Sequence, residues 1–137
     1  MKIHTTNYFN TFIAIAADSV TTAGKIPPLK AGNPTIASLQ YELISKNPYE
    51  FTSDALLFQV HAMRQDLLPS ELKEAEQLFF SKGQACLRAS PLTKKYGWGI
   101  HCNADGKIAL YGCETEDYQQ LLAHKDLKIV KAMNSSR

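Results

Sequence analysis

Residues 96–113 read YGWGIHCNADGKIALYGC, and this stretch decides the fold. On either side of NADG the hydrophobic pattern repeats every second residue, which is the period of a β-strand. Asp105-Gly106 readily supplies the positive φ that a tight turn requires. The stretch therefore predicts an antiparallel hairpin made of strands 96–102 and 107–113.

The register of this hairpin follows from its turn. A two-residue or a four-residue turn gives the same side-chain parity, and the two-residue turn sets Cys102 opposite Ala109 and Cys113 opposite Trp98. In that register the two cysteines are too far apart for a disulfide. One face then holds Trp98, Ile100, Cys102, Ala109, Tyr111 and Cys113, and the other holds Gly97, Gly99, His101, Ile108, Leu110 and Gly112.

Upstream of the hairpin the hydrophobic period changes to that of helices. Asn33-Pro34-Thr35 predicts a helix start, and Asn47-Pro48 predicts its end. Thr52-Ser53-Asp54 predicts a second helix over 53–66, although alternation within 58–62 leaves a strand open there. A third helix is expected from 69 or 70 to 82, with Gly83 as its stop.

The two ends of the chain complete the sheet. Residues 9–17 and 128–133 predict strands, and 115–124 predict a short helix. Residues 18–33 show no sustained period, which predicts a long connection, either a binding loop or a loop wrapped over the surface. This order predicts an α+β fold, in which a small antiparallel sheet of about four strands is packed by three to four helices on one face.

Composition limits the class of protein. With 137 residues, 45% of them hydrophobic and 20% charged, the chain fits one domain over 1–137. The apolar run 12–17 is too short to span a bilayer or to form a signal-peptide core, so no membrane is expected. Three cysteines without a CxxC pair predict a free thiol, no metal site and a reducing, cytoplasmic setting. The oligomeric state stays open.

Charge is segregated along the chain although the net charge is only +2. Residues 79–102 carry four cations and no acid, after an acidic stretch over 66–76. Between the third helix and the hairpin, Arg and Lys side chains with hydroxyl groups form a donor set suited to phosphate or carboxylate. Alternate glycines would leave one strand face bare for a ligand or a packed helix, next to a histidine. The predicted ligand site is Arg88, Ser90, Lys94, Gly97, Gly99 and His101.

The function follows only as a set of hypotheses. The first is binding of an anionic small molecule at this site, and whether the site also catalyses is open. Cys86 with His101 as base is a weak catalytic candidate, since most intracellular cysteines are small buried hydrophobes. The second hypothesis is a protein-interaction or regulatory module that docks an acidic surface. The third is single-stranded nucleic-acid binding through Tyr96 and Trp98, which the small net charge makes unlikely.

The absence of several sequence motifs argues against the enzyme classes that carry them. The chain has no GxxxxGK[ST] loop, dinucleotide fingerprint, HExxH, EF-hand loop or GxSxG elbow, so no cofactor is expected. Asp54 is better explained as a helix-start residue than as an acid catalyst.

Five stretches resemble a family of small stand-alone microbial proteins known as domain of unknown function 6157. The resemblance implies a single-domain cytosolic protein and brings no activity with it. Ala55 and Ala85 depart from the TSDD and GQPCLR patterns of that family, which weakens a paired-carboxylate site at Asp54. The stretches are HTTNYFNTFI, LQYELISKNPYEFTSDALLFQVHA, FFSKGQACLRASPLTKKYGWGIH, KIALYG and KIVKAM.

Overall fold

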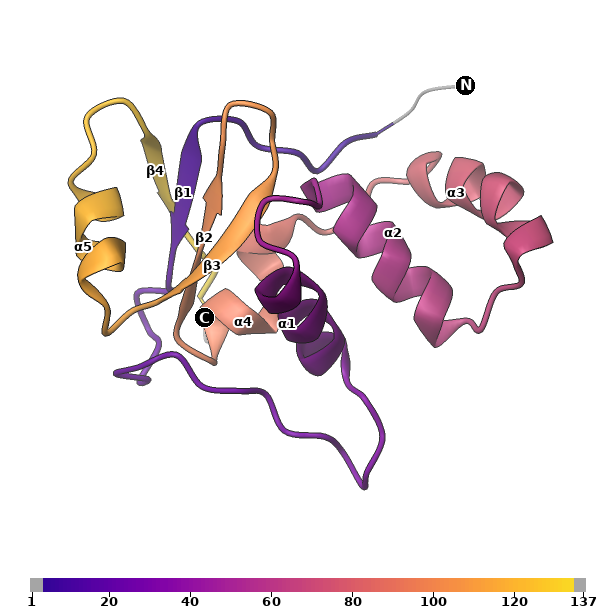
Figure 1. Cartoon of the computed structure of the whole chain (residues 1–137), viewed down its shortest axis with the longest axis horizontal. Helices are drawn as coiled ribbons and strands as arrows, with labels where there is room; N and C mark the ends of the chain where they lie inside the picture. Colours follow the sequence, from indigo (N-terminus) through magenta and orange to yellow (C-terminus); the bar gives the residue numbers. More distant parts are fainter. Residues whose placement is uncertain (1–3, 135–137) are drawn as a thin grey trace.

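A four-stranded sheet organises the chain in the computed structural model, which describes residues 4–134 (Figure 1). Strand β1 (Thr11–Ala14) lies between β2 (Trp98–Cys102) and β4 (Lys128–Lys131), and β3 (Ile108–Gly112) forms the edge beyond β2. The pairs β1–β2 and β2–β3 are antiparallel, whereas β1 and β4 are parallel. The α+β fold class is confirmed, but the sheet is mixed because the chain crosses from the β3 edge to the opposite edge before β4 begins.

The helices begin where the sequence places capping side chains. Helix α1 (Ile36–Lys46) starts with a capping box, in which Thr35 accepts from the Ser38 N–H and Ser38 accepts from the Thr35 N–H. Thr52 caps α2 (Ser53–Arg64), which confirms a helix rather than a strand there. The others are α3 (Leu72–Phe80), α4 (Pro91–Lys94), α5 (Glu116–Leu122) and the 3₁₀ turns Pro69–Glu71 and Leu87–Ala89.

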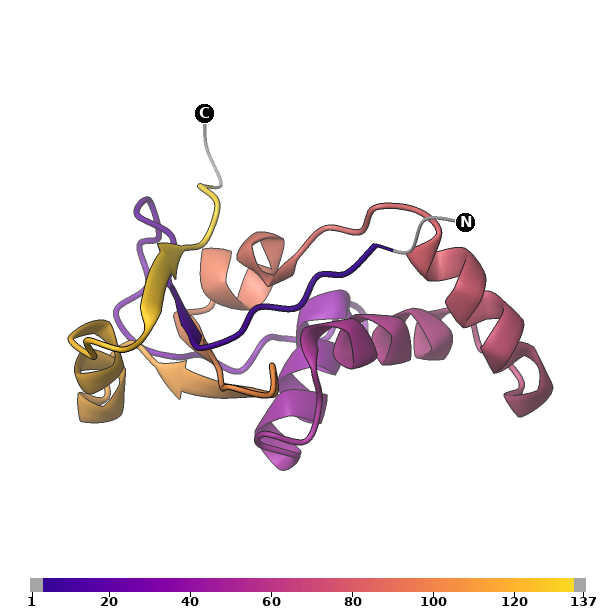
Figure 2. The same ribbon diagram turned by 90° about the horizontal axis from the view of Figure 1, so that it is seen from above.

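The sheet has a hydrophobic cluster on each face: α1, α2 and α4 pack on one face, and α5 covers the other. Figures 1 and 2 show the sheet between α5 and the other helices. On the side of α1, α2 and α4, Ile13 and Ile100 are fully buried with Leu56. On the other side Phe12 meets Tyr118 of α5 edge to face, with ring centroids 5.1 Å apart. Because both faces of the central strand are apolar, each needs its own helical cover.

The hairpin register differs from the predicted one by one residue. Cys102 pairs with Ile108 and Trp98 with Gly112, so the connection 103–107 holds an odd number of residues. Asn103 explains this turn, because its Oδ1 accepts from the backbone N–H groups of Asp105 and Lys107, at 2.9 Å each. Gly106 adopts φ 77° in the same turn. The two faces of β3 are therefore exchanged relative to the prediction.

Asp54 in the first turn of α2 holds the N-terminal segment of the described chain. Its carboxylate accepts from the Thr6 backbone N–H, the Thr6 hydroxyl and the Thr5 hydroxyl, at 2.7 Å each. Asn7 returns a bond by accepting from the Asp54 N–H at 2.9 Å. A carboxylate that accepts three hydrogen bonds has a structural role, which agrees with the interpretation of Asp54 as a helix-start residue.

Helix α3 stands farthest from the sheet (Figures 1 and 2). It has no buried residue, and it contacts α2 chiefly through Phe79 and Phe80, whose rings lie 5.7 Å and 6.4 Å from that of Phe58. No helix within residues 4–134 is long and apolar enough to cross a membrane.

Candidate functional site

The structure does not bring the predicted site residues together. Arg88 Nε donates to the carbonyl of Lys131 at 2.7 Å, which ties this side chain to the end of β4. Ser90 caps α4 and Lys94 is its last residue, and α4 packs on one face of the sheet through Leu92. His101 points to the opposite face, because it alternates with the buried Ile100 along β2. The sheet therefore separates His101 from Ser90.

Protein atoms fill the strand face that the glycines leave bare. A Cβ on Gly99 would lie 2.5 Å from Phe12 Cζ and 2.7 Å from the Tyr118 ring. Gly97, at φ 79°, lies directly against the carbonyl of Ala23 in the 18–33 connection. Of the two predicted occupants of this face, packed protein is the one observed, and α5 supplies part of it.

His101 belongs to a small polar pocket between β3 and α5. The Tyr49 hydroxyl lies 2.8 Å from His101 Nδ1 and 2.7 Å from the Tyr111 hydroxyl, so the three side chains form a continuous hydrogen-bonded chain. Tyr49 adopts φ 60°, a conformation that is uncommon for an aromatic residue. The pocket encloses about 260 Å³, and Asp117, Gln120, Leu121 and His124 complete its lining.

Burial sets the protonation states of His101 and Tyr49. It lowers the pKa of His101, and repulsion from His124 lowers it further, which favours a neutral imidazole. Burial and the bond to Tyr111 raise the pKa of Tyr49 well above its usual range. A neutral imidazole with one nitrogen held by a phenol can exchange a proton at the other. No local pattern marks Tyr49 as a neighbour of His101, because 52 residues separate them along the chain.

Cys86 has Tyr8, not His101, as its neighbour. The Tyr8 hydroxyl lies 3.4 Å from Cys86 Sγ, and burial with this contact raises the pKa of Tyr8 to about 12. All three cysteines are free thiols. Within residues 4–134 no group of three or more His, Cys, Asp or Glu side chains could hold a metal ion.

Another cavity lies between α1, α2 and the segment 84–91, and we call it the apolar cavity. It encloses about 370 Å³. Its walls are mostly aliphatic or aromatic, and His61, Arg64 and Gln84 stand among them with Cys86. Ser90 is the residue of the predicted site that reaches this cavity. The apolar walls include Ile36, Leu57, Val60, Phe79, Leu87 and Pro91.

Gln40 adds a buried polar side chain to the lining of the apolar cavity. Its side chain is 3% exposed, and its Oε1 accepts from the Ser90 hydroxyl at 2.6 Å. Ser90 Oγ itself accepts from the Leu92 N–H, which leaves the hydroxyl hydrogen for Gln40. Gln40 is one of the residues that line the cavity. A polar residue at helical spacing between Ile36 and Ile44 was the signal for it in the sequence.

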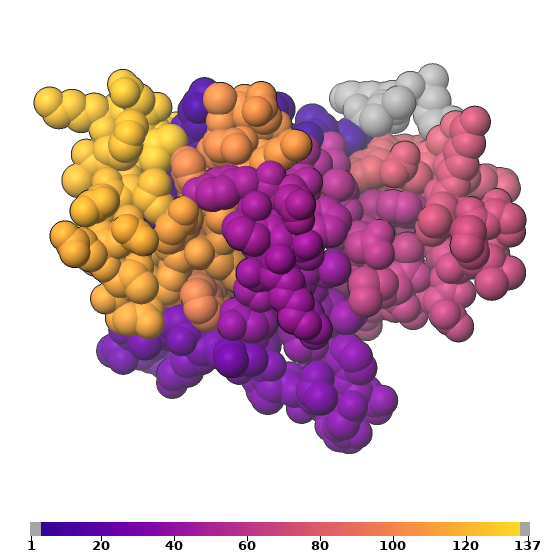
Figure 3. Space-filling model, viewed as in Figure 1, coloured from indigo at the N-terminus to yellow at the C-terminus, as the bar shows by residue number. Residues whose placement is uncertain are grey.

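A second depression adjoins the apolar cavity, and we call it the basic hollow. It encloses about 600 Å³ beneath the start of α1, and its charged lining residues are Lys30, Arg64 and Lys95. Figure 3 shows the end of the 18–33 connection standing out in this region. Among residues 4–134 the one ion pair is Lys46–Glu42, so none of these three cations is paired with a carboxylate. Lys95 lies in the predicted basic segment, whereas Arg64 and Lys30 come from distant parts of the chain.

Comparison with known proteins places the chain in a family. The model of the Family of unknown function (DUF6157) matches residues 3–137. No curated protein and no solved structure gives a significant match. The chain therefore belongs to the DUF6157 family.

Proposed function

We propose that this protein binds an anionic small molecule, with a phosphate or carboxylate group, in the basic hollow. The observation that supports this most directly is the convergence of Lys30, Arg64 and Lys95 on one depression that no carboxylate lines. Cations that share a concave surface raise the local potential, which attracts an anion. The guanidinium of Arg64 can bind two oxygens of one phosphate or carboxylate, while each lysine acts as a point charge.

The proposal keeps the ligand class expected from the sequence and moves the site. The basic segment contributes Lys95 rather than Arg88 or Lys94, and the 18–33 connection contributes Lys30. Ser90 takes part indirectly, because it orients Gln40 in the adjoining cavity. The proposed site therefore combines cations from three separate segments, which only the fold brings together.

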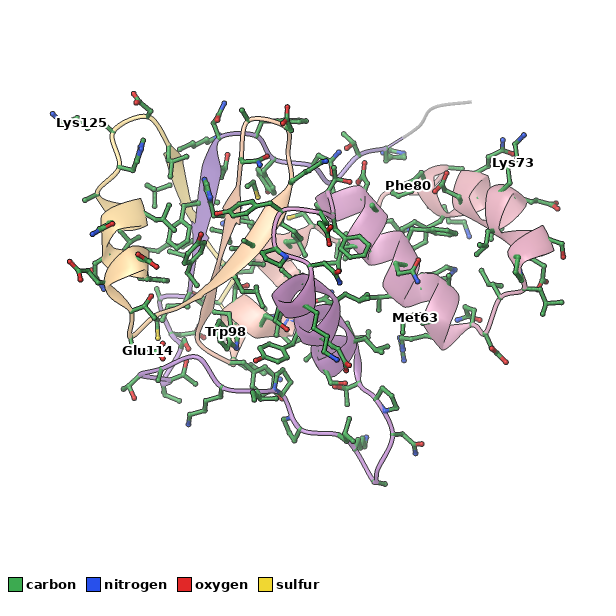
Figure 4. All side chains as sticks on the ribbon, in the orientation of Figure 1. Met63, Lys73, Phe80, Trp98, Glu114 and Lys125 are labelled. Carbon is green, nitrogen blue, oxygen red and sulfur yellow. The ribbon has the colours of Figure 1, made fainter. Side chains whose placement is uncertain are left out.

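The two aromatic residues considered for nucleic-acid stacking are engaged within the protein. Trp98 Nε1 donates to the Lys25 carbonyl at 2.8 Å, and its ring lies 5.4 Å from that of Tyr41. Figure 4 shows Trp98 between α1 and the 18–33 connection. Tyr96 packs against the core cluster beside α4. This packing favours a small-molecule ligand over a stacked nucleic acid.

Thermal unfolding with a panel of anions tests the proposal. At matched ionic strength, phosphate, pyrophosphate, citrate and short alkyl phosphates are added to the wild type and to Arg64→Ala. A ligand at about 100 times its dissociation constant adds about 2.7 kcal/mol to the free energy of unfolding, which raises the melting temperature by several degrees. Arg64→Ala should lose this shift, and Lys73→Ala, on the exposed face of α3, should keep it.

The result that overturns the proposal is equally specific. If no anion in the panel raises the melting temperature of the wild type, the basic hollow is an ordinary solvated surface. The same conclusion follows if Arg64→Ala shows the same shift as the wild type with every anion.

A further inference from the structure

The apolar cavity and the basic hollow adjoin each other. Ile36, Arg64 and Pro91 line both of them. Arg64, the last residue of α2, therefore stands at the border between an apolar compartment and a cationic one. A ligand held by Arg64 in the hollow has the apolar cavity as its neighbouring compartment.

The walls of the apolar cavity fit a hydrocarbon group better than a polar one. Its volume of about 370 Å³ lies within the range of small-molecule pockets. Leu57, Val60 and Leu87 line it, and Phe79 contributes an aromatic wall. Binding of a chain or ring there removes apolar surface from water on both partners, which a bare phosphate in the hollow would not do.

Gln40 adds one polar group to these walls. The residue is 3% exposed and lines the cavity. A side-chain amide can donate a hydrogen bond to a carbonyl or ether oxygen of a ligand. Ser90 holds the amide of Gln40 through its 2.6 Å bond to Oε1.

We infer that the natural ligand is an amphipathic anion, an acyl or aryl compound whose phosphate or carboxylate lies in the basic hollow and whose apolar part fills the apolar cavity. This inference rests on the proposed function and narrows its ligand class. The anionic end contacts Arg64, Lys30 and Lys95, and an oxygen acceptor near the apolar part contacts Gln40.

Calorimetric titration with ethyl phosphate and octyl phosphate tests the inference, both below the concentration at which octyl phosphate forms micelles. The two probes share a headgroup and differ by about six methylenes, so octyl phosphate should bind roughly 100-fold more tightly if most of them are buried. Ala85→Trp, at an exposed position on the cavity rim, should reduce the affinity for octyl phosphate to that for ethyl phosphate. Ala104→Trp, in the exposed hairpin turn, is the matched control.

A measurement on the wild type makes the test independent of any variant. In the complex with octyl phosphate, nuclear Overhauser effects should connect the octyl methylenes with the methyl groups of Leu57, Val60 and Leu87. The absence of these contacts overturns the inference.

The binding results separate the two proposals. Equal affinities for the two probes overturn the amphipathic ligand and leave the proposed function standing. A preference for octyl phosphate that survives Ala85→Trp also overturns the inference, because the octyl chain then binds outside the apolar cavity. If neither probe binds and no anion shifts the melting temperature, the proposed function itself is wrong.

Discussion

Ser90 Oγ lies 2.6 Å from Gln40 Oε1, and this hydrogen bond joins α1 to the cap of α4 inside the protein. Both side chains are almost fully buried. The same hydroxyl accepts from the Leu92 N–H at 3.2 Å. One serine therefore caps a helix, links two elements and holds the side chain of Gln40, a residue that lines the apolar cavity.

Ser90→Ala should lower the free energy of unfolding by about 2–3 kcal/mol, because it removes the cap of α4 and leaves the Gln40 oxygen buried without a donor. Gln40→Leu should lower the free energy of unfolding by less, about 1 kcal/mol, because the cap of α4 remains. Urea unfolding measures both. Ser45→Ala, on the exposed side of α1, should stay within about 0.5 kcal/mol of the wild type.

The double variant tests whether these two side chains act together. The double variant should lose about 1 kcal/mol less free energy of unfolding than the two single variants together, because the shared bond is lost only once. Strict additivity would show that the bond between Ser90 and Gln40 contributes nothing.

Asp54→Asn should release the N-terminal segment from α2. The amide nitrogen of asparagine cannot accept the bonds that Thr5 and Thr6 now donate, so we expect a loss of about 2 kcal/mol. Hydrogen exchange at the Thr6 amide should accelerate more than exchange in the sheet. Asp105→Asn, in the exposed hairpin turn, is the control. Unchanged protection of the Thr6 amide from exchange would contradict the role of Asp54 in holding this segment.

Thiol reactivity should distinguish Cys102 from the other two cysteines. Cys102 is fully buried, and burial raises its pKa to about 12, so at about pH 8 it has almost no thiolate. A disulfide reagent should modify Cys86 and Cys113, which are partly exposed, and reach Cys102 only after unfolding. Mass spectrometry of peptides identifies the sites. Modification of native Cys102 at the rate of Cys86 would contradict this burial.

Local chemistry explains which parts of the fold the sequence could predict. Thr35 and Thr52 are capping residues followed by helical spacing, and both helices start where these residues predict. The hairpin was predicted at the right position. Its predicted register was wrong by one residue, because Asn103 accepts two backbone hydrogen bonds in a connection with an odd number of residues. The parallel strand β4 depends on where α5 crosses the sheet, which no local pattern encodes.

The candidate site shows the same limit. The charge of segment 79–102 predicted a site with Arg88 and Lys94, whereas the cation of this segment that lines the basic hollow is Lys95. Arg64 and Lys30 join it only through the packing of α2 and the 18–33 connection. The alternate glycines correctly indicated a close approach, and Phe12 with Tyr118 fills that space. Single-sequence patterns therefore predict a basic, anion-binding site but do not show which cations share one depression.

His101 should make stability depend on pH in the acid range. Burial and repulsion from His124 lower its pKa in the folded state, so its contribution is fully present above the unfolded value of about 6.5. As the pH falls below this value the unfolded chain takes up the proton first. The free energy of unfolding should therefore decrease until the pH is below the folded pKa.

The groups that face His101 allow this effect to be isolated. Tyr49 bonds to its Nδ1, Tyr111 bonds to Tyr49, and Asp117 and His124 of the α5 region line the same pocket. His124→Asn removes the repulsion, so the pKa of His101 should rise toward 6.5, as measured by nuclear magnetic resonance of the ring. His4→Asn, on a different part of the protein, should leave it unchanged. If His124→Asn lowers the pKa of His101 instead, the two imidazoles do not repel each other across this pocket.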